Sequence, residues 1–268
     1  MDELAFRVDL DPLKKSGNLI LNLSRVPVHA FRQAMDFIRE FAQSAHGFPR
    51  HVALGLEGES LCGQPVPYGH VLLGTVCNIT LNGVLRAAGI PVHSRFAGLL
   101  AMDGHVPRRF EHLIRYEACT MDPSMLFIRS GMTRVIPAVR TGTGLLLAGF
   151  REIPAVALTE ALRLTALLDR MGLGHALMVG EPNRPVLGIP VAPGRVGLVV
   201  AAGLNLVAAL AESGIGSDHQ AMSGLYPADA LLRPAELERR FLTSHRLRQR
   251  LADLMENPPP HREYTHEE

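Results

Sequence analysis

The chain has 268 residues, 27 basic and 26 acidic side chains, 47% hydrophobic residues and 20% charged ones. This composition excludes a largely disordered chain, a collagen-like chain and a disulfide scaffold. The net charge of +1 excludes a protein that binds nucleic acid through a generally basic surface.

Cysteine usage and hydropathy predict the compartment. The three cysteines, Cys62, Cys77 and Cys119, are odd in number and form no Cys-x-x-Cys pair, which is typical of a reducing compartment. Residues 1–8 lack the apolar core of a signal peptide. The longest apolar run, residues 196–211, is shorter than the roughly 20 residues that a membrane-spanning helix needs. We therefore predict a cytoplasmic protein without a membrane segment.

Two blocks of the chain repeat each other. Pro27 aligns with Pro154 at an offset of 127 residues, and Ile90 aligns with Ile215 at an offset of 125. Because the two separate blocks have nearly equal offsets, the sequence predicts an internal duplication.

In chain order, each copy predicts the same five elements from its apolar runs and from the Gly and Pro residues that bound them. The first copy predicts strand 18–23, a helix starting near Pro27 and ended by Gly47, strand 51–56, loop 62–69, strand 70–77 and helix 79–88. The second copy predicts strand 145–150, helix 155–171, strand 175–179, loop 180–194, strand 196–201 and helix 204–213.

Between and after the copies the pattern is weaker. Residues 110–116 and 125–128 look strand-like, whereas Asp122-Pro123 marks a turn or a helix start. Residues 234–255 predict an arginine-rich helix with an approximate apolar stripe. Its arginines fit a solvated face, a docking or dimer helix, or, with interleaved acids, a nucleic-acid contact.

The expected fold is thus α/β, with two pseudo-symmetric β-α-β-β-α lobes and a C-terminal helix. The strand order does not follow from the sequence. The expected divisions are a lead of residues 1–16, a first lobe 17–90, a connecting segment 91–143, a second lobe 144–226 and a C-terminal helix and tail 227–268.

Familiar catalytic and metal-binding motifs are missing from the sequence. It has no Gly-x-Ser-x-Gly, no His-Glu-x-x-His and no phosphate-binding Gly-x-x-x-x-Gly-Lys-Ser/Thr, and its twelve histidines are scattered. Cys77 fits either a nucleophile near a helix start or a small apolar residue at a strand end. We predict no catalytic residues, no metal and no cofactor.

The two copies differ where the third strand turns into the helix. Thr75, Cys77 and Asn78 of the first copy align with Val200, Ala202 and Gly203 of the second. Polar groups at a helix N-terminus suit a small anion, although Asn78 or Thr80 could equally serve only as an N-cap.

The second copy contributes polar residues of its own. Arg151 and Glu152 end its first strand, and Glu181 and Asn183 follow its second strand. Arg151 could hold a carboxylate by two parallel hydrogen bonds or could form a structural ion pair with Glu152.

Four blocks in order resemble one known family, the regulatory domain of the nitrogen-regulatory repressors first known from methanogenic archaea (NrpR). The similarity runs from about residue 17 to about residue 226. The blocks are residues 74–83 (GTVCNITLNG), 131–133 (GMT), 150–154 (FREIP) and 179–183 (VGEPN).

The resemblance implies a transcriptional repressor whose regulatory domain self-associates and senses 2-oxoglutarate, which loosens the repressor from DNA. A winged helix precedes that domain in the family, but only about 16 residues precede the first predicted strand here. The expected ligand residues are Thr75, Cys77, Asn78, Thr80, Arg151, Glu152, Glu181 and Asn183.

We therefore expect a homodimeric, non-catalytic sensor of a small dicarboxylate. It would control DNA binding in trans or through a winged-helix segment absent from this chain. Two alternatives remain: an enzyme that acts on a small keto acid with Cys77 or Glu181 as the working group, and a dimeric interaction scaffold without an effector.

Overall fold

The computed structural model describes residues 1–174, 176–216 and 218–244. Its strands are β1 (Asn18–Pro27), β2 (Val52–Gly55), β3 (Ser60–Leu61), β4 (Gln64–Pro65), β5 (His70–Val76), β6 (His93–Asp103), β7 (Val106–Arg115), β8 (Gly144–Pro154), β9 (Ala176–Val179), β10 (Arg195–Ala201) and β11 (Asp218–Pro227). Its helices are α1 (Asp2–Phe6), α2 (Val28–Gln43), α3 (Ile79–Ala87), α4 (Pro123–Arg129), α5 (Val135–Thr141), α6 (Leu158–Arg170), α7 (Asn205–Glu212) and α8 (Pro234–Thr243). Short 3-10 turns occur at Tyr116–Ala118, Ala155–Ala157 and Ala228–Ala230.

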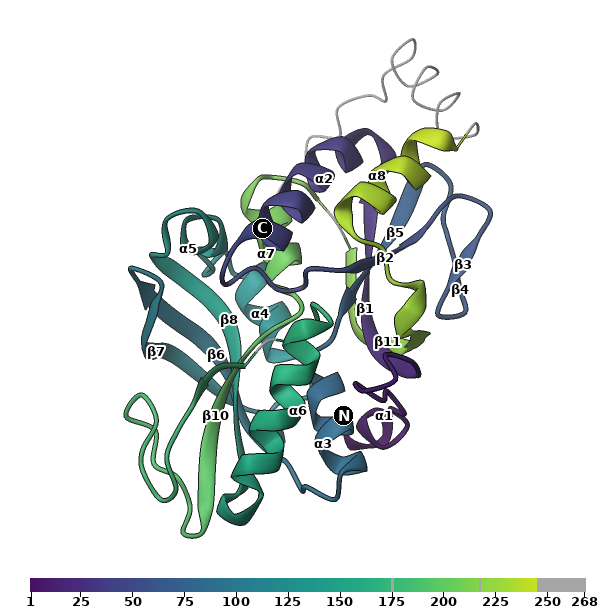
Figure 1. Ribbon diagram of the computed structural model, residues 1–268. Helices are drawn as coiled ribbons and strands as arrows, with labels where there is room; N and C mark the ends of the chain where they lie inside the picture. The colour runs from purple at the N-terminus through teal and green to yellow at the C-terminus, as the bar shows by residue number, and fades with distance from the viewer. Residues whose placement is uncertain (175, 217, 245–268) are drawn as a thin grey trace.

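The strands form two larger sheets, with helices packed around both (Figure 1). The first has the order β11-β1-β5-β2 and the second β7-β6-β8-β10-β9, and all neighbouring pairs in both are antiparallel. The expectation of a mixed α/β fold is therefore confirmed.

Each half of the chain lends a strand to the other sheet. β6 follows α3 in the chain but pairs with β8, and β11 follows α7 but pairs with β1. The orders β11-β1-β5-β2 and β6-β8-β10-β9 consequently correspond, and the two halves are interlocked.

Backbone contacts at the starts of α3 and α7 also correspond. Cys77 donates its backbone N–H to the Ile20 carbonyl at 2.8 Å, and Ala202 does the same to Leu147 at 2.9 Å. The two hydrogen bonds are related by the same offsets as the predicted repeat, so they support a structural correspondence between the two halves. The origin of the halves by duplication and the division of the chain into five segments stay predictions.

The core is built from helix faces that the apolar spacing of the sequence specifies. Phe31, Ile38 and Phe41 of α2 are buried, and their spacings of seven and three residues place them on one face of the helix. Phe31 meets Phe241 of α8 with ring centroids 4.8 Å apart, so α8 packs on α2 (Figure 1). The predicted helix 234–255 is thus observed over Pro234–Thr243, and residues 245–255 lie outside the described part of the chain.

Some local predictions were wrong. Residues 125–128 belong to α4 instead of a strand, because Asp122 caps the helix by accepting the Ser124 backbone N–H at 2.8 Å. The loop 62–69 lies partly within the β3–β4 hairpin, and α2 ends at Gln43, before Gly47. Strands β6 and β11 had no predicted counterpart. The predicted strand-like piece 110–116 lies in the edge strand β7, apart from Tyr116.

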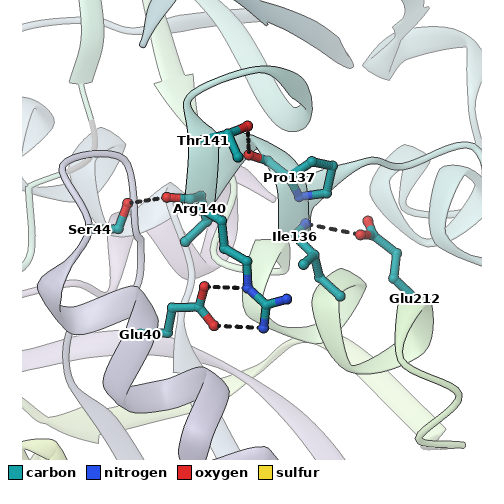
Figure 2. A network of polar contacts seen from close by, with 8 residues as sticks. Glu40, Ser44, Ile136, Pro137, Arg140, Thr141 and Glu212 are labelled. Carbon is teal, nitrogen blue, oxygen red and sulfur yellow. Dashed lines mark hydrogen bonds and ion pairs between the residues drawn. The ribbon is translucent and has the colours of Figure 1, made fainter. Parts of the chain in front are cut away.

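Hydrogen bonds join the C-terminal end of α7 to α5, and α5 in turn to α2. Figure 2 shows Glu212 accepting the backbone N–H of Ile136 at 2.9 Å; its other oxygen accepts that of Val135 at 2.7 Å. Arg140 donates two parallel hydrogen bonds to Glu40, at 2.7 and 3.1 Å (Figure 2). Glu212 thus accepts N–H groups at the start of α5 that have no partner within that helix, and this contact anchors the C-terminal end of α7. The residues at the opposite end of α7 line a cavity.

Within residues 1–174, 176–216 and 218–244, every helix is too short or too polar to cross a bilayer.

Candidate functional site

A cavity of about 280 Å³ lies where the β5–α3 and β10–α7 turns meet. Its walls also include β8 and the segment that leads from the 3-10 turn Tyr116–Ala118 into α4. The residues that line it include Asn22, Cys77, Asn78, Tyr116, Asp122, Gly149 and Gly203. A hollow therefore exists beside the helix start at which the sequence predicted an anion site.

Gly203 lets the two turns approach each other closely. A Cβ atom at this position would lie 1.9 Å from the Val76 carbonyl oxygen, so only glycine fits. Across the same contact, Asn78 donates its side-chain N–H to the Ala201 carbonyl at 3.2 Å. The turns that lead into α3 and α7 thus meet at one cavity.

Arg151 of β8 places a buried positive charge directly behind the wall of this cavity, next to the lining residues Asn78 and Gly149. Its side chain is 1% exposed, and its Nη2 donates to the Asn78 side-chain oxygen at 3.0 Å. Its Nε and Nη1 have no hydrogen-bond partner among the residues that the structure describes. A buried guanidinium without a carboxylate partner is costly, which makes this group a strong attractor for an anion.

Gly149 and Tyr116 leave room next to this charge. A Cβ atom on Gly149 would lie 3.4 Å from the Tyr116 hydroxyl and 3.7 Å from Arg151 Nη1. Burial raises the pKa of Tyr116 to about 12, although the charge of Arg151 opposes the shift. The phenol is therefore a neutral hydrogen-bond donor at the cavity wall.

Burial likewise raises the pKa of the Cys77 thiol to about 12, against the opposing effect of the Ile79 backbone N–H. Since the thiolate is the reactive form of cysteine, Cys77 is a poor nucleophile at neutral pH. This argues against the alternative of a cysteine-dependent enzyme.

Of the residues expected to bind a ligand, the structure brings Cys77, Asn78 and Arg151 together. Thr75 and Thr80 lie close by but point into the fold: Thr75 accepts from Asn22 at 3.4 Å, and Thr80 accepts the Ile20 backbone N–H at 3.1 Å. Asn78 precedes α3 without a capping hydrogen bond from its side chain, so the alternative of simple capping was wrong.

Glu152, Glu181 and Asn183 lie outside the cavity wall. Glu152 is buried and pairs with Arg95 at 2.5 Å, so the alternative of an Arg151–Glu152 ion pair was wrong. Successive strand residues point to opposite faces, which separates Glu152 from Arg151. Glu181 is exposed, and the Asn183 side chain accepts the Gly194 backbone N–H at 2.6 Å within the loop before β10.

Asn22, Tyr116, Asp122 and Gly149 are the residues that the sequence did not point to. Asn22 is a polar residue inside the apolar run of residues 19–23, which could have drawn attention to it. Asp122 was marked by the sequence only as a turn or a helix start, and Tyr116 carries no pattern. Neither could be assigned to a site, because only the packing of the connecting segment brings them to the cavity. Across the described ranges, no cluster of three or more His, Cys, Asp or Glu side chains is arranged to hold a metal ion.

The fold with its cavity suits a regulatory domain, and comparison with known proteins identifies the family. Residues 1–232 match the family described as NrpR regulatory domains NRD1 and 2. The chain belongs to this family, which confirms the resemblance found in the sequence.

Two curated relatives are named nitrogen regulators. The global nitrogen regulator NrpRI of Methanosarcina mazei is 31% identical over 215 residues, covering 80% of this chain and 66% of the relative. The global nitrogen regulator NrpR of Methanocaldococcus jannaschii is 24% identical over 216 residues, covering 81% of this chain and 36% of the relative. The chain thus spans less than two thirds of their length. Their names and the family match confirm a regulatory, non-enzymatic protein.

A solved structure has the same fold. The nitrogen repressor-like protein from Methanococcus jannaschii superposes with a TM-score of 0.72 at 22% identity, covering 87% of this chain and 96% of that one.

Proposed function

We propose that this chain is the effector-sensing part of a nitrogen-regulatory transcriptional repressor and that its cavity binds 2-oxoglutarate or a similar small dicarboxylate. The observation that carries the proposal is the guanidinium of Arg151, which is buried behind Asn78 and Gly149 of the cavity wall with two of its nitrogens unpaired among the described residues. An anion that entered the cavity would supply the missing partner.

The contacts refine how a ligand would lie. Sequence reasoning placed one carboxylate at the start of α3 and the other at Arg151. Arg151 Nη2 and the Asn78 side chain are only 3.0 Å apart, so both belong to the same end of the cavity. One carboxylate would therefore meet Arg151 and the Tyr116 hydroxyl, and the remainder of the ligand would extend past the starts of α3 and α7.

Such a ligand would bridge the two halves of the molecule. Arg151 belongs to the five-stranded sheet, whereas Asn78 follows β5 of the four-stranded one. A ligand that favours one arrangement of the halves shifts their equilibrium by its difference in affinity, typically about 1–3 kcal/mol. We infer that this shift is passed on to DNA binding, in trans or through a winged helix outside this chain.

We further propose that the domain works as a homodimer in the cytoplasm. Its three cysteines are free, which fits a reducing compartment, and the family resemblance implies self-association. Light scattering on the purified chain tests the dimer, with a monomer mass over the micromolar range as the result against it.

Calorimetric titration with 2-oxoglutarate tests the effector, using wild type and Arg151→Met. We expect saturable binding to wild type and none to Arg151→Met. Because the substitution removes an uncompensated buried charge, it should leave the free energy of unfolding unchanged or raised. A purely structural arginine would give the opposite result, a loss of stability.

Arg163→Met is the matched control, since Arg163 lies on α6 with 48% of its side chain exposed and pairs with Glu160 one turn away. It should bind 2-oxoglutarate as wild type does. Ligand at 100 times its Kd should stabilise wild type by about 2.7 kcal/mol. An absence of heat at millimolar ligand, or unchanged binding by Arg151→Met, would sink the proposal.

A further inference from the structure

The cavity that has a buried cation behind one wall has a carboxylate on another wall. Asp122 stands at the start of α4 and is partly buried, and its Oδ1 accepts the Ser124 backbone N–H at 2.8 Å. Among the residues that the structure describes, none forms an ion pair with it. Asp122 therefore presents a negative charge to whatever enters.

The charges in the cavity do not balance for a dicarboxylate. Arg151 supplies one positive charge, whereas a dicarboxylate brings two negative ones and ionised Asp122 adds a third. Like charges in a site shielded from water repel each other strongly, and a carboxyl group relieves the repulsion by keeping its proton.

We propose that Asp122 sets the charge selectivity of this cavity: a dicarboxylate enters together with one proton, which Asp122 holds while the ligand is bound. The inference rests on the proposed function and adds its ligand chemistry and its regulation by pH.

The groups that face Asp122 support this assignment. Cys77 from the β5–α3 turn and Tyr116 from the connecting segment are neutral, since burial raises the pKa of each to about 12. The turn before α7 contributes Gly203 and Leu204, and β11 contributes Met222, none of which carries charge.

Two positive charges lie nearby. Arg151 stands behind the wall formed by Asn78, with its one hydrogen-bonding nitrogen directed there. The α-amino group of Met1 acts on Cys77, but Met1 is exposed, so solvent screens its charge. Neither group pairs with the Asp122 carboxylate.

Asp122 is already inclined toward its protonated form. Burial raises its pKa above the ordinary 3.8, although the backbone N–H groups of Ser124 and Met125 act in the opposite direction. A bound dianion raises it further. Between the pKa of the free protein and that of the complex, the affinity should fall tenfold for each unit by which the pH rises.

The test is calorimetric titration of 2-oxoglutarate from pH 5.5 to 8.5 in two zwitterionic or cationic buffers with different ionisation enthalpies, because phosphate would itself compete for an anion site. The variant is Asp122→Asn, which keeps the oxygen that accepts the Ser124 N–H, because asparagine is an equally good helix N-cap. Asp103→Asn, an exposed carboxylate in the β6–β7 hairpin, is the matched control.

For wild type and Asp103→Asn we expect uptake of close to one proton, with a Kd that rises up to tenfold per pH unit. For Asp122→Asn we expect no uptake, a Kd independent of pH and binding at least tenfold tighter than wild type at pH 8. Wild-type binding without proton uptake, or an Asp122→Asn profile like that of wild type, overturns this inference alone. No binding by any of the three proteins overturns the proposed function and this inference with it.

Discussion

Asn205 should be one of the most important single polar residues for the stability of the fold. It stands at the start of α7, is fully buried, and forms hydrogen bonds with both the backbone N–H and the backbone carbonyl of one β8 residue. Its side chain accepts the Leu147 N–H at 2.8 Å and donates to the Leu147 carbonyl at 2.9 Å. Thr80, at the aligned place beside α3, makes only the single bond to the Ile20 N–H.

The expected cost follows from what Asn205→Ala leaves behind. The Leu147 N–H loses its partner in the interior, which costs about 1–3 kcal/mol. The Leu147 carbonyl keeps the N–H of Ala202, so the second lost bond costs about 0.5–1.5 kcal/mol. We expect a total of about 1.5–4.5 kcal/mol for Asn205→Ala and about 1–3 kcal/mol for Thr80→Ala.

Urea unfolding followed by circular dichroism measures both free energies, provided that the slopes with denaturant agree between variants. Asn205→Thr is the informative control, because threonine can reproduce the single bond made by Thr80 and should fall between wild type and Asn205→Ala. A cost below 1 kcal/mol for Asn205→Ala, or one smaller than that of Thr80→Ala, would refute the reasoning.

Two further perturbations test the buried charges. Arg95→Ala removes the only ion-pair partner of Glu152 among the described residues and should cost about 3 kcal/mol in urea unfolding, with part of it recovered by adding Glu152→Gln. His219 should make stability fall in acid: burial lowers its pKa from 6.5 to about 4, so the unfolded chain takes up a proton first as the pH drops. The contribution of His219 is complete above about pH 6.5 and is lost towards pH 4; unfolding curves for His219→Gln that are as steep in pH as those of wild type would contradict this.

Most elements within the two repeated blocks could be predicted because local patterns determine them. Apolar runs bounded by Gly17 and Pro27, or ended by Gly89, fix strands and helices without help from the rest of the chain. β6 and β11 escaped prediction because each forms by crossing to the other sheet, and the half-buried residues of β11 show no apolar alternation. A strand of that kind is stabilised by its partner more than by its own sequence.

The site divides along the same physical line. Asn78 and Arg151 could be found because polar residues stand there at the ends of apolar strands, a placement that is costly unless it has a purpose. Tyr116 and Asp122 could not, since a local cap at α4 and the packing of the connecting segment decide where they lie. Thr75 and Thr80 were equally prominent in the sequence, yet their hydroxyl groups bond within the fold.

The differences between the aligned halves explain why, in the described structure, only one side of the cavity has a buried cation behind it. The repeat aligns Arg151 with Ser24, and Asn78 with Gly203. Ser24 is buried and uncharged, so the start of α7 has no cation facing it from β1. Position 203 must be glycine, because a side chain there would clash with the backbone of Val76. The close contact that Gly203 permits brings Asn78 to Ala201 at 3.2 Å and leaves Arg151 one neutral partner instead of a carboxylate. A pair of lobes with identical turns could not do this, because two bulky turns would keep the halves apart and two arginines would repel each other.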